Sequence, residues 1–425
     1  MFHPNIRRPD TIAVLKVVAL DLSAFVPDRI SKPAKYFLVA NILNGLGNGV
    51  FGVVIQLYLM TLGFGSMDLS STFMMNSLGM LLMTLPAGVI ADRYGRGSVF
   101  LAGMTATLVA FTLIMIGRTI EVLSIAWLLL GLGNATGSVL GPLYSSLFDN
   151  DDMDRAFGLQ GAISIMSNAV GSLMGFIPPM MVHSYSLTLQ RSYWLVLFII
   201  LMFFVAQLPL YYGAIRSSPE PKGNGLAPRF NLRSKAVVYK FSFLYTVQNI
   251  AFGFFSFFPY YVNTRFGVQS DALGALYFIS RFVQAGSNAA APKVAKRLGS
   301  VKTISLALGL TVPFWLMFPF APNYLWVSVI YILRLLIGSF CNPLMPSLFY
   351  RLLYEEEKAT ANSLTTMASM GSNMVAPRIG GYLMENVSID APAYLGGALY
   401  LVYASSFYLL LSNEAEKEKS QSFEA

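Results

Sequence analysis

The chain has few charged residues. Asp, Glu, Lys and Arg make up 12% of its 425 residues, about half of the roughly 25% that is usual in soluble domains. So few charges could not cover the surface of a soluble protein. The 32 Phe and 22 Tyr exclude a disordered chain. We therefore expect a polytopic membrane protein.

Cysteine and histidine are nearly absent as well. A single cysteine, Cys341, and two histidines, His3 and His183, exclude an intrachain disulfide and a His/Cys metal site. The sequence contains no GxxxxGK[ST] phosphate-binding loop, so ATP cannot power the protein directly. No paired carboxylates and no nucleophile–base pair lie at membrane depth, so we expect neither an enzyme nor a cofactor.

Long windows without any charge fill much of the chain. A helix needs about 20 apolar residues to cross the hydrocarbon core. Continuous runs rich in Gly and Met favour helices over the alternating strands of a barrel. We predict an all-α membrane protein with twelve transmembrane helices, at 36–63, 67–90, 98–117, 122–148, 157–183, 192–214, 237–263, 270–290, 301–320, 324–349, 359–385 and 392–412.

A stretch rich in proline, glycine and basic residues divides the predicted helices into two groups. We interpret residues 216–236 as a cytoplasmic linker between a six-helix half at 35–215 and a second half at 237–412. Residues 413–425 would form a cytoplasmic tail.

The N-terminal segment, residues 1–34, carries an apolar run over residues 11–26. Lys16 and Asp21 interrupt this run, which favours an interfacial helix on the cytoplasmic face. A cleaved signal sequence is one alternative, because basic residues precede the run. A thirteenth span is another, although it would break the even topology.

Basic residues lie mainly on one side of the predicted spans. With both termini in the cytoplasm, 23 of the 29 Lys and Arg residues fall on inner segments. The outer loops hold three, Arg118, Arg191 and Arg265. This is the asymmetry of the positive-inside rule. The net charge of +8 therefore reports topology, and no nucleic-acid partner is needed to explain it.

The two halves repeat each other in sequence. Residues 137–148, GSVLGPLYSSLF, match residues 338–349, GSFCNPLMPSLF, at seven of twelve positions. Asp68 and Asp271 open the second and eighth spans. Six spans per half give both halves one orientation, which is a parallel repeat about an axis along the membrane normal. Such a repeat predicts a cavity between the halves near the midplane.

The loop between the second and third spans carries a motif, GVIADRYGRG over residues 88–97. It resembles the G-x-L-A-D-R-x-G-R-(K/R) signature of the major facilitator superfamily and departs from it at Gly97, where a base is usual. A degenerate copy, KRLG over residues 296–299, occupies the equivalent loop of the second half. The resemblance covers residues 35–412 and implies the major facilitator fold, with transport by alternating access.

The resemblance also implies a role for the motif itself. It suggests an inner gate that locks one state and breaks during transport, formed by Gly88, Asp92, Arg93, Gly95 and Arg96. A simpler interpretation needs no gate, because glycines permit a tight turn and arginines face anionic headgroups.

Three arginines lie inside predicted spans. Arg281 and Arg334 fall near the midplane, where a charge costs at least ~2.5 kcal/mol and should face a wet cavity or a partner. Guanidinium groups suit carboxylates and phosphates, so we predict contact with an anionic substrate. Hydrogen bonds to helix carbonyls or amides are the alternative. Arg378 lies nearer the outer side, seven residues before Glu385, which favours a structural role.

Amide side chains also interrupt the apolar spans. Polar residues in such spans face either a cavity or another helix. The resemblance places the first, fourth, seventh and tenth spans around the cavity. With Arg281 and Arg334, we therefore assign five amides to the substrate cavity: Asn44, Asn48, Asn134, Gln248 and Asn249.

The resemblance implies a secondary transporter of small organic solutes. Exporters of the family that use protons often carry an arginine four residues before a glycine of the fourth span. Here Trp127 precedes Gly131 at that spacing, which weakens the case for standard drug/proton antiport. The candidates for an outer-side or coupling role are Arg378, Asp68, Asp271 and Glu385.

Two directions of transport remain open. A drug or metabolite efflux permease is the leading interpretation. The alternative is an organic-anion or organophosphate uptake or exchange carrier that uses the intramembrane arginines. In either case the expected partners are a small-molecule substrate and the lipid bilayer, and we expect a monomeric, multi-pass protein of the plasma membrane.

Overall fold

The computed structural model describes residues 27, 30–145, 147–148, 152–216, 232–254, 256–354 and 357–423. The predicted interfacial helix at 11–26 and most of the predicted linker lie outside these residues. Within them the chain forms helices joined by short loops. The terms outer and inner are used below as the distribution of basic residues predicts them.

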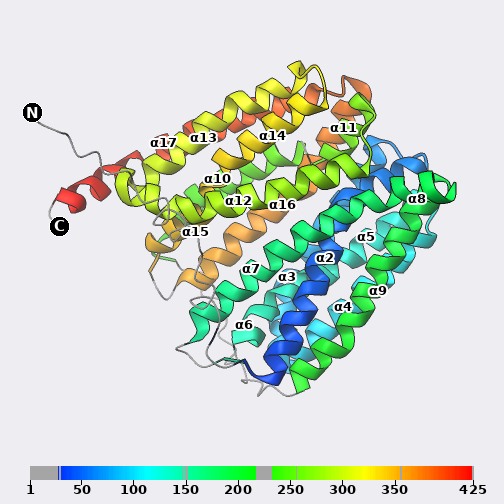
Figure 1. Ribbon diagram of the computed structural model, residues 1–425. Coiled ribbons are helices and arrows are strands. Elements are labelled where there is room, and N and C mark those ends of the chain that lie inside the picture. The colour runs from blue at the N-terminus through cyan, green and yellow to red at the C-terminus, as the bar shows by residue number, and fades with distance from the viewer. Residues whose placement is uncertain are drawn as a thin grey trace, which may run out of the picture.

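The N-terminal half forms one bundle of helices (Figure 1). Its elements are α2 (Lys32–Thr61), α3 (Ser66–Tyr94), α4 (Arg96–Ile116), α5 (Ile120–Ala135), η2 (Thr136–Val139), α6 (Leu140–Ser145), α7 (Met153–Leu173), η4 (Met174–Phe176), α8 (Ile177–Tyr185) and α9 (Leu189–Arg216).

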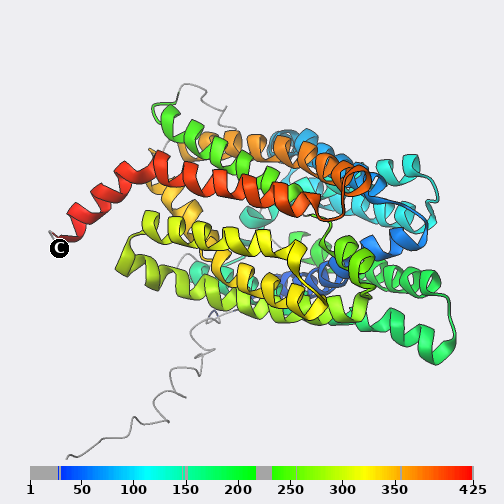
Figure 2. The ribbon, with the colours of Figure 1, turned by 90° about the horizontal axis from the view of Figure 1, so that it is seen from above.

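The C-terminal half forms a second bundle beside the first, as both views show (Figures 1 and 2). Its elements are α10 (Lys235–Phe254), α11 (Phe258–Phe266), α12 (Ser270–Leu298), α13 (Ser300–Met317), η5 (Phe318–Phe320), α14 (Tyr324–Gly338), α15 (Cys341–Arg351), α16 (Lys358–Asn386) and α17 (Ala391–Phe423). The helix of the last predicted span thus continues into the predicted tail at 413–425, whose Ala, Glu and Lys favour a helix.

Nine helical segments of the described chain are long and apolar enough to cross a membrane, which confirms a helical membrane protein. The other three predicted spans correspond to α3, α12 and α16, which have 29 residues each. In contacts between the halves, α3 packs on α16 and α12 packs on α7. Part of their surface therefore faces protein rather than lipid, which explains their polar residues. At these three helices the count of twelve spans stays a prediction.

Two predicted spans are interrupted at equivalent places. The fourth span is broken by η2 between α5 and α6, and the tenth is broken by a turn between α14 and α15. Pro142 and Pro343 follow these breaks at the same position of the sequence repeat. Proline has no N–H to offer the carbonyl four residues earlier, so both helices lose regular geometry at the start of the repeat.

The loop motif and its degenerate copy form the same turn. Gly95 joins α3 directly to α4 with φ of 91°, and Gly299 joins α12 directly to α13 with φ of 86°. A side chain would disfavour this backbone conformation, which glycine adopts readily. The repeat detected in the sequence is therefore present in the backbone at these loops.

The described end of the linker is bound to the C-terminal half. The backbone N–H groups of Arg233 and Ser234 donate to the carboxylate of Glu357, at 2.5 and 2.9 Å. These bonds stabilise the ionised form and hold the pKa of Glu357 below its usual range.

Candidate functional site

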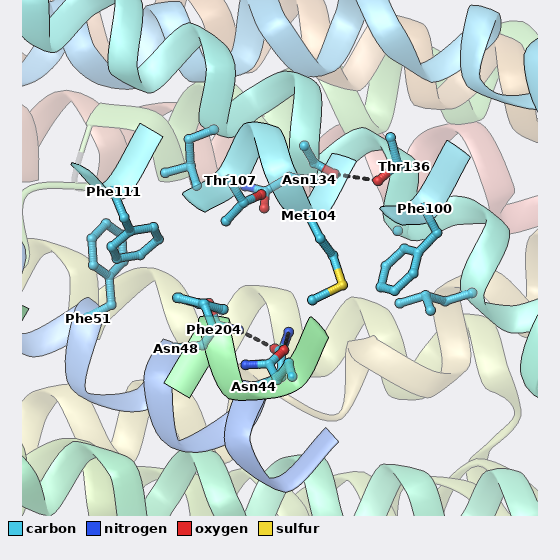
Figure 3. Close-up of a pocket in the computed structure, with 15 residues that line it drawn as sticks. Asn44, Asn48, Phe51, Phe100, Met104, Thr107, Phe111, Asn134, Thr136 and Phe204 are labelled. Atoms are coloured by element: carbon cyan, nitrogen blue, oxygen red, sulfur yellow. Dashed lines mark hydrogen bonds between the residues drawn. The ribbon is translucent and has the colours of Figure 1, made fainter. Parts of the chain in front are cut away.

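The N-terminal half encloses a cavity of about 150 Å³ between α2, α4, α5, η2 and α9 (Figure 3). Its lining combines amides, small residues and aromatic rings, and among the described residues it contains no charged side chain. The lining residues are Asn44, Asn48, Phe51, Phe100, Met104, Thr107, Phe111, Leu130, Gly133, Asn134, Thr136, Gly137, Leu140, Phe204 and Gln207.

A chain of amides crosses this cavity. Asn48 donates to the Oδ1 of Asn44, and Asn44 donates to the Oε1 of Gln207 at 3.4 Å. Gln207 is fully buried, and its Nε2 has no hydrogen-bond partner among the described residues. Asn48 and Asn134 are exposed. The cavity is therefore polar from an exposed rim at Asn48 and Asn134 to a buried end at Gln207.

The interrupted fourth span forms one wall of the cavity. Asn134, Thr136 and Gly137 lie at or beside η2 and line the space. The Thr136 hydroxyl turns back and donates to the carbonyl of Gly133 at 2.7 Å (Figure 3). In transporters, helices that break at membrane depth commonly border a binding site, because irregular backbone needs polar surroundings there.

Arg334 lies in the C-terminal half, on α14, one turn before the break of the tenth span. Its side chain is 8% exposed. The guanidinium lies over three rings, with centroid distances of 5.4 Å to Phe252, 4.7 Å to Trp315 and 5.4 Å to Tyr331. Its Nε finds no hydrogen-bond partner within the described ranges of the chain. The ring faces stabilise the charge and leave hydrogen-bonding capacity unused.

Arg281 lies on α12, one helical turn after Tyr277. It is half-buried and donates to the Oε1 of Gln284 at 3.2 Å. The Tyr277 ring stacks on that of Tyr331 at 6.1 Å, and the guanidinium of Arg334 lies over Tyr331. The two midplane arginines therefore belong to one cluster with two stacked tyrosines.

The predicted cavity residues divide into three groups. Asn44, Asn48 and Asn134 line the N-terminal cavity, and the two arginines form their own cluster. The remaining amides take part in packing within the C-terminal half. Gln248 accepts from the Tyr403 hydroxyl at 3.4 Å, and Asn249 donates to the Ser369 hydroxyl and to the Tyr245 carbonyl.

The predicted outer-side residues Arg378 and Glu385 both contact α3. Arg378 donates to the Met67 carbonyl at 3.1 Å and to the Ser71 hydroxyl. The carboxylate of Glu385 accepts from the Met67 N–H at 3.1 Å and from Ser66 at 3.3 Å. The two side chains therefore join α16 to α3 across the interface between the halves.

Asp68 and Asp271 lie in the first turns of α3 and α12. Asp68 caps its own helix by accepting from the Gly65 N–H at 3.1 Å. A carboxylate at a helix N-terminus is stabilised by the helix dipole. Both aspartates therefore have a local structural explanation for opening their helices.

The residues of the predicted inner gate lie at the junction of α3 and α4. Gly88 is exposed on α3, with no atom near the position of a Cβ. Arg93 lies over the ring of Tyr94 at 5.4 Å. Gly95 makes the turn, and Arg96 begins α4. Of Asp92 only the backbone is described.

Sequence reasoning missed Gln207 and the residues that join the outer ends. Gln207 is the one amide inside the charge-free run at 192–215, a signal as strong as those at the predicted sites. Ser66 lies two residues before Asp68, and Ser270 lies one residue before Asp271. The glycines that these serines contact could not be identified without the fold.

Comparisons with known proteins place the chain in a family. The sequence model of the Major Facilitator Superfamily matches residues 37–370 and, in a second match, 252–425. An uncharacterized MFS-type transporter of Bacillus subtilis, YceJ, is 22% identical over 351 residues, which is 81% of this chain and 87% of the relative.

Solved transporter structures share the fold at low sequence identity. A mutant of the nucleoside transporter NupG aligns with a TM-score of 0.72 and 13% identity, over 88% of this chain and 99% of that one. A bacterial homologue of the iron transporter ferroportin, in an inward-facing state, aligns with a TM-score of 0.69 and 16% identity, over 88% and 98%. With most of its length matched by the family, the chain belongs to the Major Facilitator Superfamily and is a membrane transporter rather than an enzyme.

Proposed function

We propose that the protein is a secondary transporter that carries small organic solutes by alternating access between two halves. The observation that supports this most is the way the outer ends of the halves are joined. The Ser66 hydroxyl donates to the Gly381 carbonyl at 2.9 Å, and the Ser270 hydroxyl donates to the Gly175 carbonyl at 2.7 Å. Each bond crosses from one half to the other.

These two bonds are related by the internal repeat. Ser66 is the first residue of α3 and Ser270 is the first residue of α12. Each serine contacts a glycine near the outer end of a helix of the opposite half. Two equivalent contacts at one end of the molecule are what a rocking motion about a pseudo-twofold axis requires.

Contacts between the halves become weaker toward the inner side. Ser77 donates to the Asn373 carbonyl at 3.2 Å, and Thr84 lies 3.5 Å from the sulfur of Met370. Gly88, one turn further along α3, is exposed, and no described atom lies within 4 Å of the position of its Cβ. This gradient favours a state that is closed outside and open inside.

A cross-link at the outer ends tests the proposal. The position of a Gly65 Cβ lies 3.4 Å from the Glu385 carboxylate, so a short bifunctional thiol reagent with a cleavable disulfide should join Gly65→Cys to Glu385→Cys. In proteoliposomes, this cross-link should abolish transport and its reductive cleavage should restore transport. The native Cys341 is buried. Full transport by the cross-linked protein would overturn alternating access at this interface.

A matched control uses two outer residues of one half. Arg265 and Asp390 form an ion pair within the C-terminal half. The same reagent, joining Arg265→Cys to Asp390→Cys, should leave transport intact, because both residues lie in the same half. Its failure to do so would attribute the first result to local damage rather than to the locked interface.

Export is the direction that we propose, following the sequence analysis. When cells with the same membrane energisation are loaded with a substrate, a deletion strain should retain more of the substrate than cells that express the protein. Faster uptake by the expressing cells would overturn export. A plasma-membrane location and a monomeric state remain predictions of the sequence.

Arg334 favours a second candidate, an organic-anion carrier. A buried guanidinium with an unpaired Nε and no carboxylate contact among the described residues would gain from an anionic ligand. If an anion binds there, Arg334→Leu should lower the flux of an anionic fluorophore about tenfold or more. Arg118→Leu, on the outer loop, is the control. Unchanged anion flux in Arg334→Leu would reject this candidate.

A further inference from the structure

The cavity of the N-terminal half has a counterpart in the C-terminal half, and there a side chain of the protein fills the space. Counted from the first residues of α5 and α14, Ile120 and Tyr324, Leu130 corresponds to Arg334. Leu130 lines the cavity together with Phe51 and Phe111, whose rings lie 5.0 Å apart. In the other half Arg334 covers the ring pair of Phe252 and Trp315, which lie 5.6 Å apart.

This comparison of the two halves indicates which kind of ligand the N-terminal cavity can accept. In the C-terminal half a planar, hydrogen-bonding group of the chain itself lies on an aromatic pair. In the N-terminal half the shorter, apolar Leu130 replaces the arginine, and the space beside the rings stays open (Figure 3). A planar group supplied by a ligand could lie on Phe51, Phe111 and Phe204 in the same manner.

The size of the cavity limits the ligand to about one ring. A cavity of about 150 Å³ in another protein is known to accommodate benzene, and this cavity has about 150 Å³. No charged residue lines it in the part of the chain that the structure describes. A free ion would lose its hydration there without gaining a partner of opposite charge, so a neutral ligand is favoured.

The amides define the polar part of the ligand. The unpaired Nε2 of Gln207 is a buried donor that needs an acceptor. Asn134 and Asn48, at the rim, can donate and accept. A ring that carries a carbonyl beside an N–H, as in a lactam, meets both requirements at once.

We propose that the N-terminal cavity binds a small, neutral, planar ring with lactam-type hydrogen-bonding groups. The inference deepens the proposed transport function, because it names the substrate class of the N-terminal part of the pathway. The ring lies on the phenylalanines, and its carbonyl accepts from Gln207. Binding does not depend on the direction or coupling of transport.

A cysteine reporter tests binding in the purified full-length protein. Gly137 lines the cavity and has free space at the position of a Cβ, so Gly137→Cys introduces a thiol without a clash. Millimolar uracil should slow its alkylation by N-ethylmaleimide. In Gly137→Cys/Gln207→Leu this protection should weaken about tenfold, the effect of losing one bond to a buried donor.

Matched variants and probes complete the experiment. Gln248→Leu removes an amide that binds Tyr403 in the other half, and it should leave protection unchanged. Asn134→Ala, at the exposed rim, should weaken protection about threefold and remains informative if Gln207→Leu fails to fold. Toluene has no hydrogen-bonding group and tests whether the amides matter. Benzamidine is a cation and tests whether the neutrality of the ligand matters.

Several results would overturn the inference. Equal protection by toluene would mean an apolar cavity, and stronger protection by benzamidine would mean a cation site. No protection by uracil in a folded protein would mean a cavity that holds only water. None of these outcomes affects the cross-linking test of alternating access, so failure of the binding site and failure of the transport proposal remain distinguishable.

Discussion

Helices of opposite halves cross at two places, and each crossing has a hydrogen bond from a serine to a glycine carbonyl. Only one of the two crossings also has charged side chains. At the crossing of α3 with α16, Ser66 donates to Gly381; at the crossing of α12 with α7 and η4, Ser270 donates to Gly175. Three residues before each glycine, Arg378 occupies the first crossing and Ser172 the second. The repeat thus keeps the contact and varies what surrounds it.

The difference suggests a division of roles. Around Gly381, Arg378 and Glu385 add charge-assisted bonds to the first turn of α3, where the helix dipole favours the carboxylate. Around Gly175, Ser172 donates to the Gly274 carbonyl at 3.2 Å without any charge. We therefore expect the α3–α16 crossing to hold the outer side closed more strongly, and the α7–α12 crossing to give way first.

The largest effect is expected from filling the close approach at either crossing. A Cβ on Gly381 would lie 2.6 Å from the Ser66 carbonyl oxygen, and one on Gly175 would press on the Ser270 carbonyl. Gly381→Ala and Gly175→Ala should each disfavour the closed state by about 2–3 kcal/mol. Spin labels at the exposed Arg191→Cys and Val387→Cys would report this in pulsed EPR distances.

Gly52→Ala is the control for this comparison. Gly52 is an exposed helical glycine with no atom within 4 Å of the Cβ position, so its substitution should leave the distances unchanged. Distances shifted equally in all three variants would mean that helix propensity, rather than the crossings, controls closure.

Removing the charge from the first crossing should have the next largest effect. Arg378→Ala loses bonds to the Met67 carbonyl and the Ser71 hydroxyl, and should shift closure by about 2 kcal/mol. The equivalent Ser172→Ala loses one neutral bond and should shift it by about 1 kcal/mol. Equal shifts in the same EPR measurement would remove the asymmetry between the crossings.

Local signals in the sequence predicted part of this arrangement. Asp68 and Asp271 marked the starts of two helices, and the loop motif and its degenerate copy marked equivalent turns at Gly95 and Gly299. Periodicity, charge-free length and capping act between neighbouring residues, so they survive in a single sequence. For the same reason the depth of Arg334 could be counted along its helix.

The partners across the interface could not be predicted in this way. Ser66 and Gly381 are 315 positions apart, and serine and glycine are common in membrane helices, so nothing local links them. The same limit applied to Arg378, whose nearest charge along the helix was Glu385. In the structure both side chains instead contact α3, because helix packing decides which face meets which neighbour.

The carboxylate of the first crossing should contribute less than its arginine. Glu385 is exposed, so water weakens its bonds to Met67 and Ser66. Glu385→Gln should shift closure by about 1 kcal/mol or less. Asp68→Asn, which affects a cap inside the N-terminal half, should lower the melting temperature without moving the EPR distances. A distance shift in Asp68→Asn larger than that in Glu385→Gln would contradict the assignment of Glu385 to the crossing.

The smallest effects should come from losing the serine-to-glycine hydrogen bonds, one of which is present at each crossing. Ser66→Ala and Ser270→Ala each remove one hydroxyl, which at Ser66 also lies 3.3 Å from the exposed Glu385 carboxylate. The glycine carbonyls keep their place in the helices and water screens the carboxylate, so each variant should shift closure by about 0.5 kcal/mol. Because the sites share no partner, the double variant should add the two shifts if the crossings open independently. A double shift clearly larger than the sum would show that the crossings act as one unit, and the proposed order of opening would then be wrong.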